Sequence, residues 1–406
     1  LAVNVGSAGA PVVNGGALGT PSSGTATNLT GLPLAGLVTQ AAYTFVGNNT
    51  GSSAVPTAVD IAALTTKGTP AAGDYVILSD QAASGAWKKA TVSTIGGVTS
   101  VNGQTGALTV LTQPQGRLTL TSATPVMGSS VAGATTVYYA LAIGNQIPIY
   151  DGTNFVPTVF TELSQATTDT TKSPAAVTTD SNYDVFVWSD SGTMRATRGP
   201  AWTSDTARSA GTALVAVNGI YLNNASITNG PAASRGTYVG TIRSNGSSTI
   251  DYILGAQGTA AVLGVWNNYN RVQVSTATSE STASWTYTSA TIRASNASNV
   301  VRVSFVTGLS EDSLLVTAHQ AYGLAAAVGA TASVGCALDS TTVKDKFNNA
   351  NNNTAAQPFT IGIAFTHAYA PQLGFHFIAM VENGDGTNIT TFIGQTRQNL
   401  VVTTCM

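Results

Sequence analysis

The stretch FTIGIAFTHAYA, residues 359–370, alternates bulky and small side chains without a break. The bulky set is Phe359, Ile361, Ile363, Phe365, His367 and Tyr369, and the set between them is Thr360, Gly362, Ala364, Thr366, Ala368 and Ala370. A period of two over twelve residues is the pattern of a β-strand. It predicts a long strand whose bulky face lies in a core and whose small face lets another sheet or subunit approach closely.

Other parts of the chain carry the same kind of signal. QLGFHFIAMVE, residues 372–382, repeats the alternation after Ala370-Pro371, which favours an antiparallel hairpin between the two runs. YDVFVW (183–188) and VVRVSFV (300–306) are apolar on both faces, which is typical of central strands. Many short strands with polar turns predict an all-β fold whose C-terminal part is a β-sandwich or a jelly-roll-like domain.

The composition supports a β-rich protein and argues against two classes of partner. Charged residues make up 8% of the chain, against roughly 25% in an average soluble protein. Abundant Ser, Thr and Asn favour strands and turns over long helices. The net charge of −2 and the lack of a Lys/Arg stripe argue against nucleic acid as a direct ligand. No apolar run reaches ~18 residues, so we expect no membrane insertion.

The order of these patterns predicts four regions. Residues 1–40, rich in Gly, Ala, Ser, Thr and Pro, are expected to form an extended attachment arm, and residues 41–97 a small β shaft module. Residues 98–148 are expected to form a β-hairpin linker or shaft module, because VTSVNGQTGALTV (98–110) places Asn102-Gly103 between strand-like runs. Residues 149–406 then form the C-terminal β-domain, with a split near 200 as an alternative. The shaft modules hold too few large apolar residues for a monomeric core, so assembly with other copies is expected.

Several motifs resemble those of one group of viral proteins. The run DYVILSD from Asp74, followed after five residues by AWKKATVSTI, is similar to modules of tail-fibre and spike proteins of tailed bacteriophages. FVGNNTGSSAVPTAV (45–59) and the hairpin at 98–110 resemble modules of the same proteins. IYDGTNFVPT (149–158) and YDVFVWSDSGTMRATRGPAW (183–202) are similar to a domain further along them.

The resemblance implies a structural role in the virion. It implies a homotrimer in which each shaft module is completed by the two other chains, and attachment to other virion proteins through the N-terminal region. The protein would be made in the cytoplasm of the host bacterium, and its distal domain would bind a bacterial surface glycan without cleaving it. A polysaccharide depolymerase on the same scaffold and a head-attached fibre or decoration protein are the alternatives. The sequence does not distinguish head from tail attachment.

The run WNNYN, residues 266–270, is the candidate glycan-binding site. Trp266 and Tyr269 would stack on sugar faces, and Asn267, Asn268 and Asn270 would hydrogen-bond to hydroxyls. The alternative is that Trp266 is buried in the core and that the asparagines form a turn.

Candidate catalytic carboxylates matter because glycoside hydrolysis usually needs two acidic groups about 5 to 10 Å apart. Glu311 and Asp312 are adjacent, and adjacent residues of a strand point to opposite faces. Turn-forming, solvated carboxylates explain the set as well, so no catalytic residue is predicted. The remaining candidates are Asp180, Asp184, Asp190 and Asp205.

The histidines and cysteines predict neither a metal site nor a cofactor. None of the three histidines has a metal-ligand partner at a suitable spacing. His367 is expected in the core and His376 on the exposed side of its strand. Cys336 and Cys405 are expected as free thiols rather than as a disulfide, since nothing else indicates an oxidising compartment.

Overall fold

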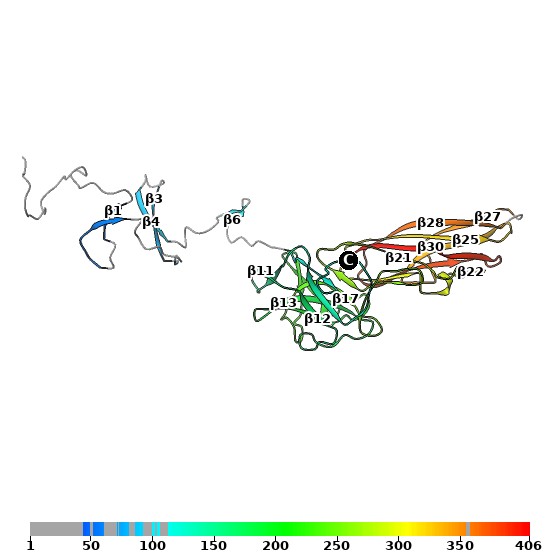
Figure 1. Cartoon of the computed structure of the whole chain (residues 1–406), viewed down its shortest axis with the longest axis horizontal. Helices are drawn as coiled ribbons and strands as arrows, with labels where there is room; N and C mark the ends of the chain where they lie inside the picture. The colour runs from blue at the N-terminus through cyan, green and yellow to red at the C-terminus, as the bar shows by residue number, and fades with distance from the viewer. Residues whose placement is uncertain are drawn as a thin grey trace, which may run out of the picture. The chain divides into compact units, whose positions relative to one another are not determined.

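The chain consists of two units, and the regular secondary structure of their described residues is almost entirely β-strand (Figure 1). The computed structural model describes residues 44–48, 52–60, 71, 73–80, 86–91, 100–101, 104–105, 113–354 and 358–406. The units are Leu1–Gly106 and Ala107–Met406. Within the described residues, the helical structure is confined to short 3-10 turns such as Ala210–Thr212 and Ser295–Ala297. The all-β fold class predicted from the sequence is confirmed.

The described residues of the first unit form three separate two-stranded antiparallel sheets. They pair β1 (Thr44–Gly47) with β2 (Thr57–Asp60), β3 (Tyr75–Asp80) with β4 (Ala86–Thr91), and β5 (Ser100–Val101) with β6 (Gln104–Thr105). The hairpins expected from DYVILSD to AWKKAT and within VTSVNGQTGALTV are therefore confirmed. The predicted attachment arm at 1–40 lies outside the described residues.

The second unit begins with a group of sheets around a six-stranded one. The order of the six-stranded sheet is β14 (Thr193–Ala201), β13 (Asn182–Asp190), β17 (Thr237–Arg243), β16 (Ile220–Asn223) and β15 (Leu214–Val217), with β20 (Val265–Asn267) also paired to β17. Beside it are the sheet β12 (Leu163–Ala166), β9 (Thr136–Leu141), β7 (Gly116–Thr119) and the pair β10 (Gln146–Tyr150) and β11 (Phe155–Val159). The run YDVFVW is β13, which lies between two strands as predicted.

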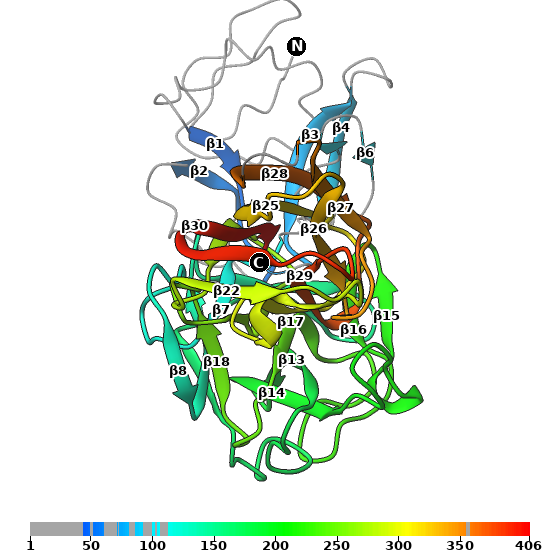
Figure 2. The same cartoon turned by 90° about the vertical axis from the view of Figure 1, so that its right-hand side faces the viewer.

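The rest of the second unit consists of two further sheets, one of eight strands and one of five. The first has the order β27 (Lys346–Asn352), β26 (Ala330–Leu338), β29 (Gly374–Asn383), β24 (Arg302–Thr307), β19 (Ala261–Leu263), β18 (Ile250–Ile253) and β8 (Val131–Ala134), with β23 (Arg293–Ala294) paired to β29. The second has the order β21 (Gln273–Thr278), β30 (Thr390–Cys405), β25 (Leu314–Leu324) and β28 (Phe359–Tyr369), with β22 (Ser284–Tyr287) paired to β30. In Figure 2, β28, β25 and β30 follow one another in one layer, and β27, β26 and β29 lie in the other.

The stretch FTIGIAFTHAYA forms β28, and its alternation has the predicted consequence. Ile363, Phe365 and Tyr369 are buried, whereas the small residues between them are exposed. The buried face packs against the other sheet, because the Tyr369 hydroxyl lies 3.4 Å from the Cys336 sulfur on β26. The two sheets thus enclose a core between them, as in a sandwich.

The predicted hairpin between residues 359–370 and 372–382 is wrong. β28 pairs with β25, whereas β29 pairs with β24 and β26 of the facing sheet. The chain crosses between sheets after Ala370-Pro371. The reason is burial on both faces of β29, where Ile378, Met380 and Val381 are almost completely inaccessible. Such a strand needs a neighbour on each side and cover on each face. The run VVRVSFV contributes β24, which is central as predicted, between β29 and β19.

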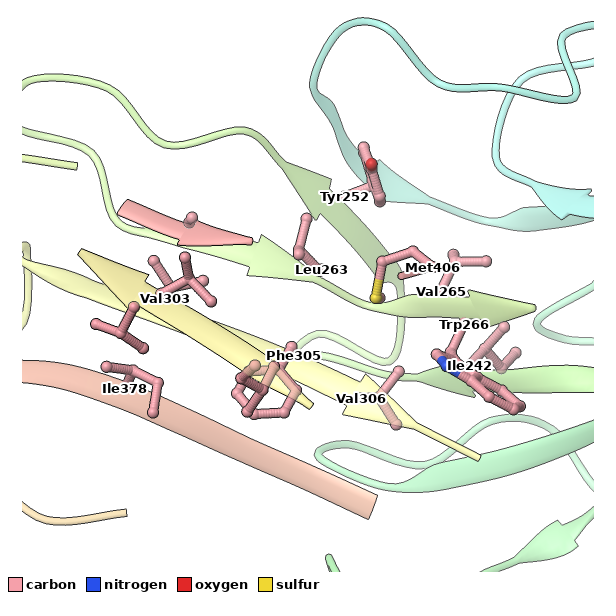
Figure 3. Close-up of a cluster of buried hydrophobic side chains, with 14 of the residues drawn as sticks. Ile242, Tyr252, Leu263, Val265, Trp266, Val303, Phe305, Val306, Ile378 and Met406 are labelled. Carbon is pink, nitrogen blue, oxygen red and sulfur yellow. The ribbon is translucent and has the colours of Figure 1, made fainter. Parts of the chain in front are cut away.

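The compact second unit starts earlier than the predicted boundary at residue 149. Leu118 on β7 and Val137 and Tyr139 on β9 are buried in the same core as Trp266 and Phe305. Residues 113–148 therefore belong to this unit instead of forming a shaft module, and the unit is not divided near residue 200. Figure 3 shows the part of this core where β20, β24 and β29 meet.

Candidate functional site

Trp266, the first residue of the predicted glycan-binding run, is fully buried. It lies on β20, opposite Thr241 of β17. Its ring is 6.5 Å from that of Tyr238, and the Arg271 guanidinium lies 5.3 Å from its centroid. Figure 3 shows it in the core beside Ile242. The prediction that Trp266 offers a stacking surface to sugars is wrong, because β20 is a sheet strand that directs this side chain inward.

Asn267 and Asn270 hold the segment that leads into β7. The Asn267 Oδ1 accepts a hydrogen bond from the Leu118 N–H at 2.6 Å, and its Nδ2 donates to the Leu118 carbonyl at 3.3 Å. The Asn270 Nδ2 donates to the carbonyls of Pro114 (2.8 Å) and Gly116 (3.1 Å). These amides replace the backbone partners that β7 lacks on that side. Their main contacts are structural, so neither amide is free to bind hydroxyls as predicted.

The remaining residues of the run line a surface cleft of about 420 Å³. The cleft brings together side chains and backbone from four separate parts of the second unit. It is lined by Gln113, Gly219, Tyr221, Asn268, Tyr269, Asn270, Arg271 and Glu311. Asn268, Tyr269 and Asn270 therefore do lie together at a surface, as the sequence predicted, but without Trp266.

The loop that presents Tyr269 is fixed at both ends. On one side the Asn268 N–H donates to the Val239 carbonyl at 3.0 Å, and on the other Val272 exchanges two 3.0 Å backbone hydrogen bonds with Met406. Asn270 adopts a positive φ of 55°, which asparagine tolerates better than most residues. The Tyr269 ring packs beside Leu222 and its neighbours. The cleft wall is therefore held in place before any ligand binds.

Charge in the cleft is largely neutralised. Arg271 bridges Glu311 at 2.9 Å and Asp312 at 2.6 Å, so its guanidinium is already paired. Burial raises the pKa of Tyr269 to about 12, which keeps its hydroxyl protonated at neutral pH. The surface thus offers two half-buried tyrosines, Tyr221 and Tyr269, with amides and a hydrogen-bonding carboxylate. Such a lining suits a hydroxyl-rich, uncharged ligand.

Sequence reasoning misses most of the cleft. Tyr221 comes from β16 and Glu311 from the connection between β24 and β25, and both are more than 40 residues away from Tyr269. Among the cleft residues outside the run, Arg271 is the one that the sequence could indicate, because it directly follows the run. Strand geometry argues against the Glu311-Asp312 pair, but the pair lies in a loop, where both carboxylates reach the same arginine.

Three of the four candidate catalytic aspartates are held by cations. Arg208 binds the buried Asp184 through two hydrogen bonds of 2.7 and 2.9 Å, and Thr241 donates to it at 2.7 Å. Arg243 lies 2.5 Å from Asp205, and Lys172 lies 2.5 Å from Asp190. Carboxylates fixed in ion pairs serve the fold, and this arrangement gives no support to a hydrolytic pair among them.

His376 is buried, whereas the sequence predicted it on the exposed side of its strand. Its Nδ1 lies 2.6 Å from Asp339 Oδ2, and its Nε2 lies 3.0 Å from the Leu373 carbonyl. Burial opposes the charged form most strongly, but the hydrogen bonds to Asp339 and the Leu373 carbonyl, together with the negative charges of Asp339 and Asp205, outweigh it and raise the pKa of His376 above its ordinary value. His367 is half-buried and meets the Tyr369 ring edge-on at 4.5 Å.

Within the described residues, neither the cysteines nor the possible metal ligands form a second candidate site. Cys336 and Cys405 are free thiols, which confirms that prediction. Among the residues described in the structure, no group of three or more His, Cys, Asp or Glu side chains is placed to hold a metal ion. The same residues include no helix with the length and apolar character needed to cross a membrane.

Comparisons with known proteins do not identify a family. No protein-family model and no curated protein matches the chain. Among solved structures, dimeric latent PorU from Porphyromonas gingivalis aligns with a TM-score of 0.22 and 9% identity, over 56% of this chain and 24% of that one. A Cry1Da tryptic core variant from Bacillus thuringiensis aligns with a TM-score of 0.15 and 8% identity, over 65% of this chain and 49% of that one. Both scores are too low to indicate a shared fold.

Proposed function

We propose that this chain is a structural protein of a bacteriophage virion, a trimeric fibre or spike whose C-terminal unit binds a glycan on the host surface. The motif resemblance described above suggests it. The observation that carries it is the exposure of large apolar side chains on the N-terminal hairpins. These are Phe45 (48% exposed), Val46 (57%), Val55 (84%), Tyr75 (61%) and Ile77 (67%).

Such hairpins are incomplete as single copies. A two-stranded hairpin is at best marginally stable in water, and Val59 is the one buried hydrophobic residue among the described residues of this unit. Covering a side chain such as Ile77 contributes roughly 1.5–3 kcal/mol. Two further copies of the chain would supply that cover and complete each module. The exposed apolar surface of the N-terminal unit supports self-association, and the resemblance supports the trimeric number.

The mass of the full chain in solution tests the assembly. Size-exclusion chromatography with light scattering is expected to give three times the chain mass of 41.0 kDa. A monomer at micromolar concentration whose N-terminal hairpins are ordered, as judged by protection of their amides from hydrogen exchange, would refute the proposal.

The cleft around Tyr269 supplies the proposed receptor contact. Its paired arginine, tyrosines and amides are the groups that recognise neutral sugars. We expect Tyr269→Ala and Tyr221→Ala each to weaken binding to the recognised bacterial polysaccharide by about tenfold, near 1.4 kcal/mol. Tyr138→Ala, at a half-buried tyrosine outside the cleft, is the matched control.

The probes are purified lipopolysaccharides and capsular polysaccharides immobilised for surface plasmon resonance. Equal binding by the cleft variants and the control would show that the cleft is not the glycan-binding site and would leave the assembly proposal intact. Release of oligosaccharides during the same incubation would instead favour the polysaccharide depolymerase.

A further inference from the structure

One broad face of the second unit has no cover within the described part of the unit. It is the outer face of the sheet β21, β30, β25 and β28, opposite the face that packs on β26 and β29. Along β28 this face carries the exposed small residues of the stretch FTIGIAFTHAYA. The register places residues of β25 and β30 beside them, since Thr317 pairs with both Thr366 and Val401, and His319 with both Ala364 and Asn399.

Outside the bulge of β30 at residues 394–397, the strand residues of this outer face include no Asp, Glu, Lys or Arg. They are Thr360, Gly362, Ala364, Thr366 and Ala368 on β28, Leu315, Thr317, His319, Ala321 and Gly323 on β25, Thr391, Ile393, Asn399, Val401, Thr403 and Cys405 on β30, and Gln273, Ser275 and Ala277 on β21. A face that meets another copy of itself brings like charges together, so the absence of charge removes the main obstacle to self-association.

β30 carries one charged residue, Arg397, in an irregular part of the strand. The strand contains a bulge at residues 394–397, where its pairing with β25 skips from Gln398 to Ile393. The Gln395 N–H donates to the Glu280 carbonyl at 2.9 Å, which fixes the bulge to the connection between β21 and β22. Arg397 is exposed within this bulge, outside the residues that pair with β25.

The face also has a protruding side chain and a hollow, both of which suit an aliphatic partner. Leu315 projects at one end of β25 with 47% of its surface exposed. Near the other end of the same strand is a hollow of about 370 Å³, lined mainly by apolar residues. Its lining is Gly323, Leu324, Ala325, Pro358, Thr360, Ile389, Thr391 and Ile393.

The size of the face matches what an interface between copies needs. Strands of eleven residues, rising about 3.3 Å per residue and spaced about 4.8 Å apart across four strands, cover roughly 700 Å². A standard protein interface buries about 800 Å² on each partner. Small residues on a flat face also let two backbones approach closely, as few side chains stand between them.

We propose that this face packs against the same face of other copies of the chain, turned toward a shared symmetry axis. That the partner is another copy of this chain rests on the proposed function. The new element is a contact surface in the second unit. Leu315 and Ile389 would be covered in the assembly.

Cysteine cross-linking of the full chain tests this contact. Ala364→Cys, at the centre of the face, is made together with Cys405→Ser, which removes the half-exposed thiol. Cys336 remains, because it is buried and burial raises the pKa of its thiol to about 11. Ala216→Cys in the same background is the matched control, since it places a cysteine on an exposed alanine of β15.

A short bismaleimide is expected to join chains that carry Ala364→Cys into covalent dimers, two of the three chains in each trimer, and to leave chains that carry Ala216→Cys largely single. Labelling with a monofunctional maleimide and the thermal unfolding midpoint check that both variants are reactive and folded. A trimeric mass without cross-linking of the Ala364→Cys variant, or equal cross-linking of both variants, would overturn this interface and leave the proposed fibre function standing. A monomeric mass would overturn both.

Discussion

At the scale of single residues, the contacts of His376 show how one buried side chain gives the fold a dependence on pH. The groups that favour its protonated form are Asp339, which hydrogen-bonds to it, and Asp205 nearby. Because the folded state raises the pKa of His376, its contribution to stability is complete below the ordinary histidine pKa of about 6.5. That contribution is lost as the pH rises through the higher folded pKa.

We therefore expect the free energy of unfolding to fall as the pH is raised from the ordinary histidine pKa through the folded one. Asp339→Asn should reduce this step, because a neutral amide stabilises the imidazolium ion less than a carboxylate does. Denaturant titrations at a series of pH values measure both proteins. An unchanged pH profile in Asp339→Asn would show that the ion pair does not control this titration. His367→Gln, at the histidine that packs on Tyr369, serves as the comparison and should keep the step.

At the scale of the element, substitutions on the two faces of β28 should differ in how much they change the free energy of unfolding. Ile363 faces the core and is 7% exposed, so Ile363→Ala should lower the free energy of unfolding by about 2–5 kcal/mol. Thr366→Ala lies on the outer face and should change it by less than about 1 kcal/mol. Urea unfolding followed by intrinsic fluorescence distinguishes the two. Similar losses at both positions would mean that the alternation does not define inside and outside.

The success of the prediction for β28 and its failure for β29 have one physical cause. Periodicity is a local property, and it indicates which face of a strand is buried. Pairing is a contact between distant parts of the chain, so the alternation at 372–382 indicates a strand but not its neighbours. The prediction for the run WNNYN fails for a related reason. Its first two residues end a sheet strand and the next three form a loop, a boundary that composition does not mark.

The cleft can be predicted only in part for the same reason. Asn268 and Tyr269 are identifiable because they are close in sequence. Tyr221 and Glu311 reach the cleft through the order of strands in two sheets, which no local pattern specifies. The early start of the second unit is likewise hidden, because Asn267, whose amide hydrogen-bonds to the backbone of Leu118, lies 149 residues further along the chain.

At the scale of the whole molecule, the uncovered hairpins predict that assembly depends on their apolar surface. Ile77→Asp puts a charge where the proposed assembly buries an aliphatic side chain, and burying an unpaired charge is costly. We expect this variant to shift the protein toward smaller species by at least about tenfold in dissociation constant, measured by sedimentation velocity over a dilution series. Ser53→Asp, at an exposed polar position, should leave the distribution unchanged. A trimer that withstands Ile77→Asp would place the assembly contacts elsewhere.

The position of β30 has a consequence for biosynthesis. This sixteen-residue strand pairs with β21, β22 and β25, and each of those strands precedes it in the chain. Arg117 near the start of the unit donates to the carbonyl of Met406 at 3.0 Å, so the first and last parts of the unit are joined directly. While β30 is still inside the ribosome, the sheet it completes has a gap at its centre. The second unit must therefore finish folding after its synthesis, and a nascent chain that stops before residue 390 would expose open strand edges to chaperones and proteases.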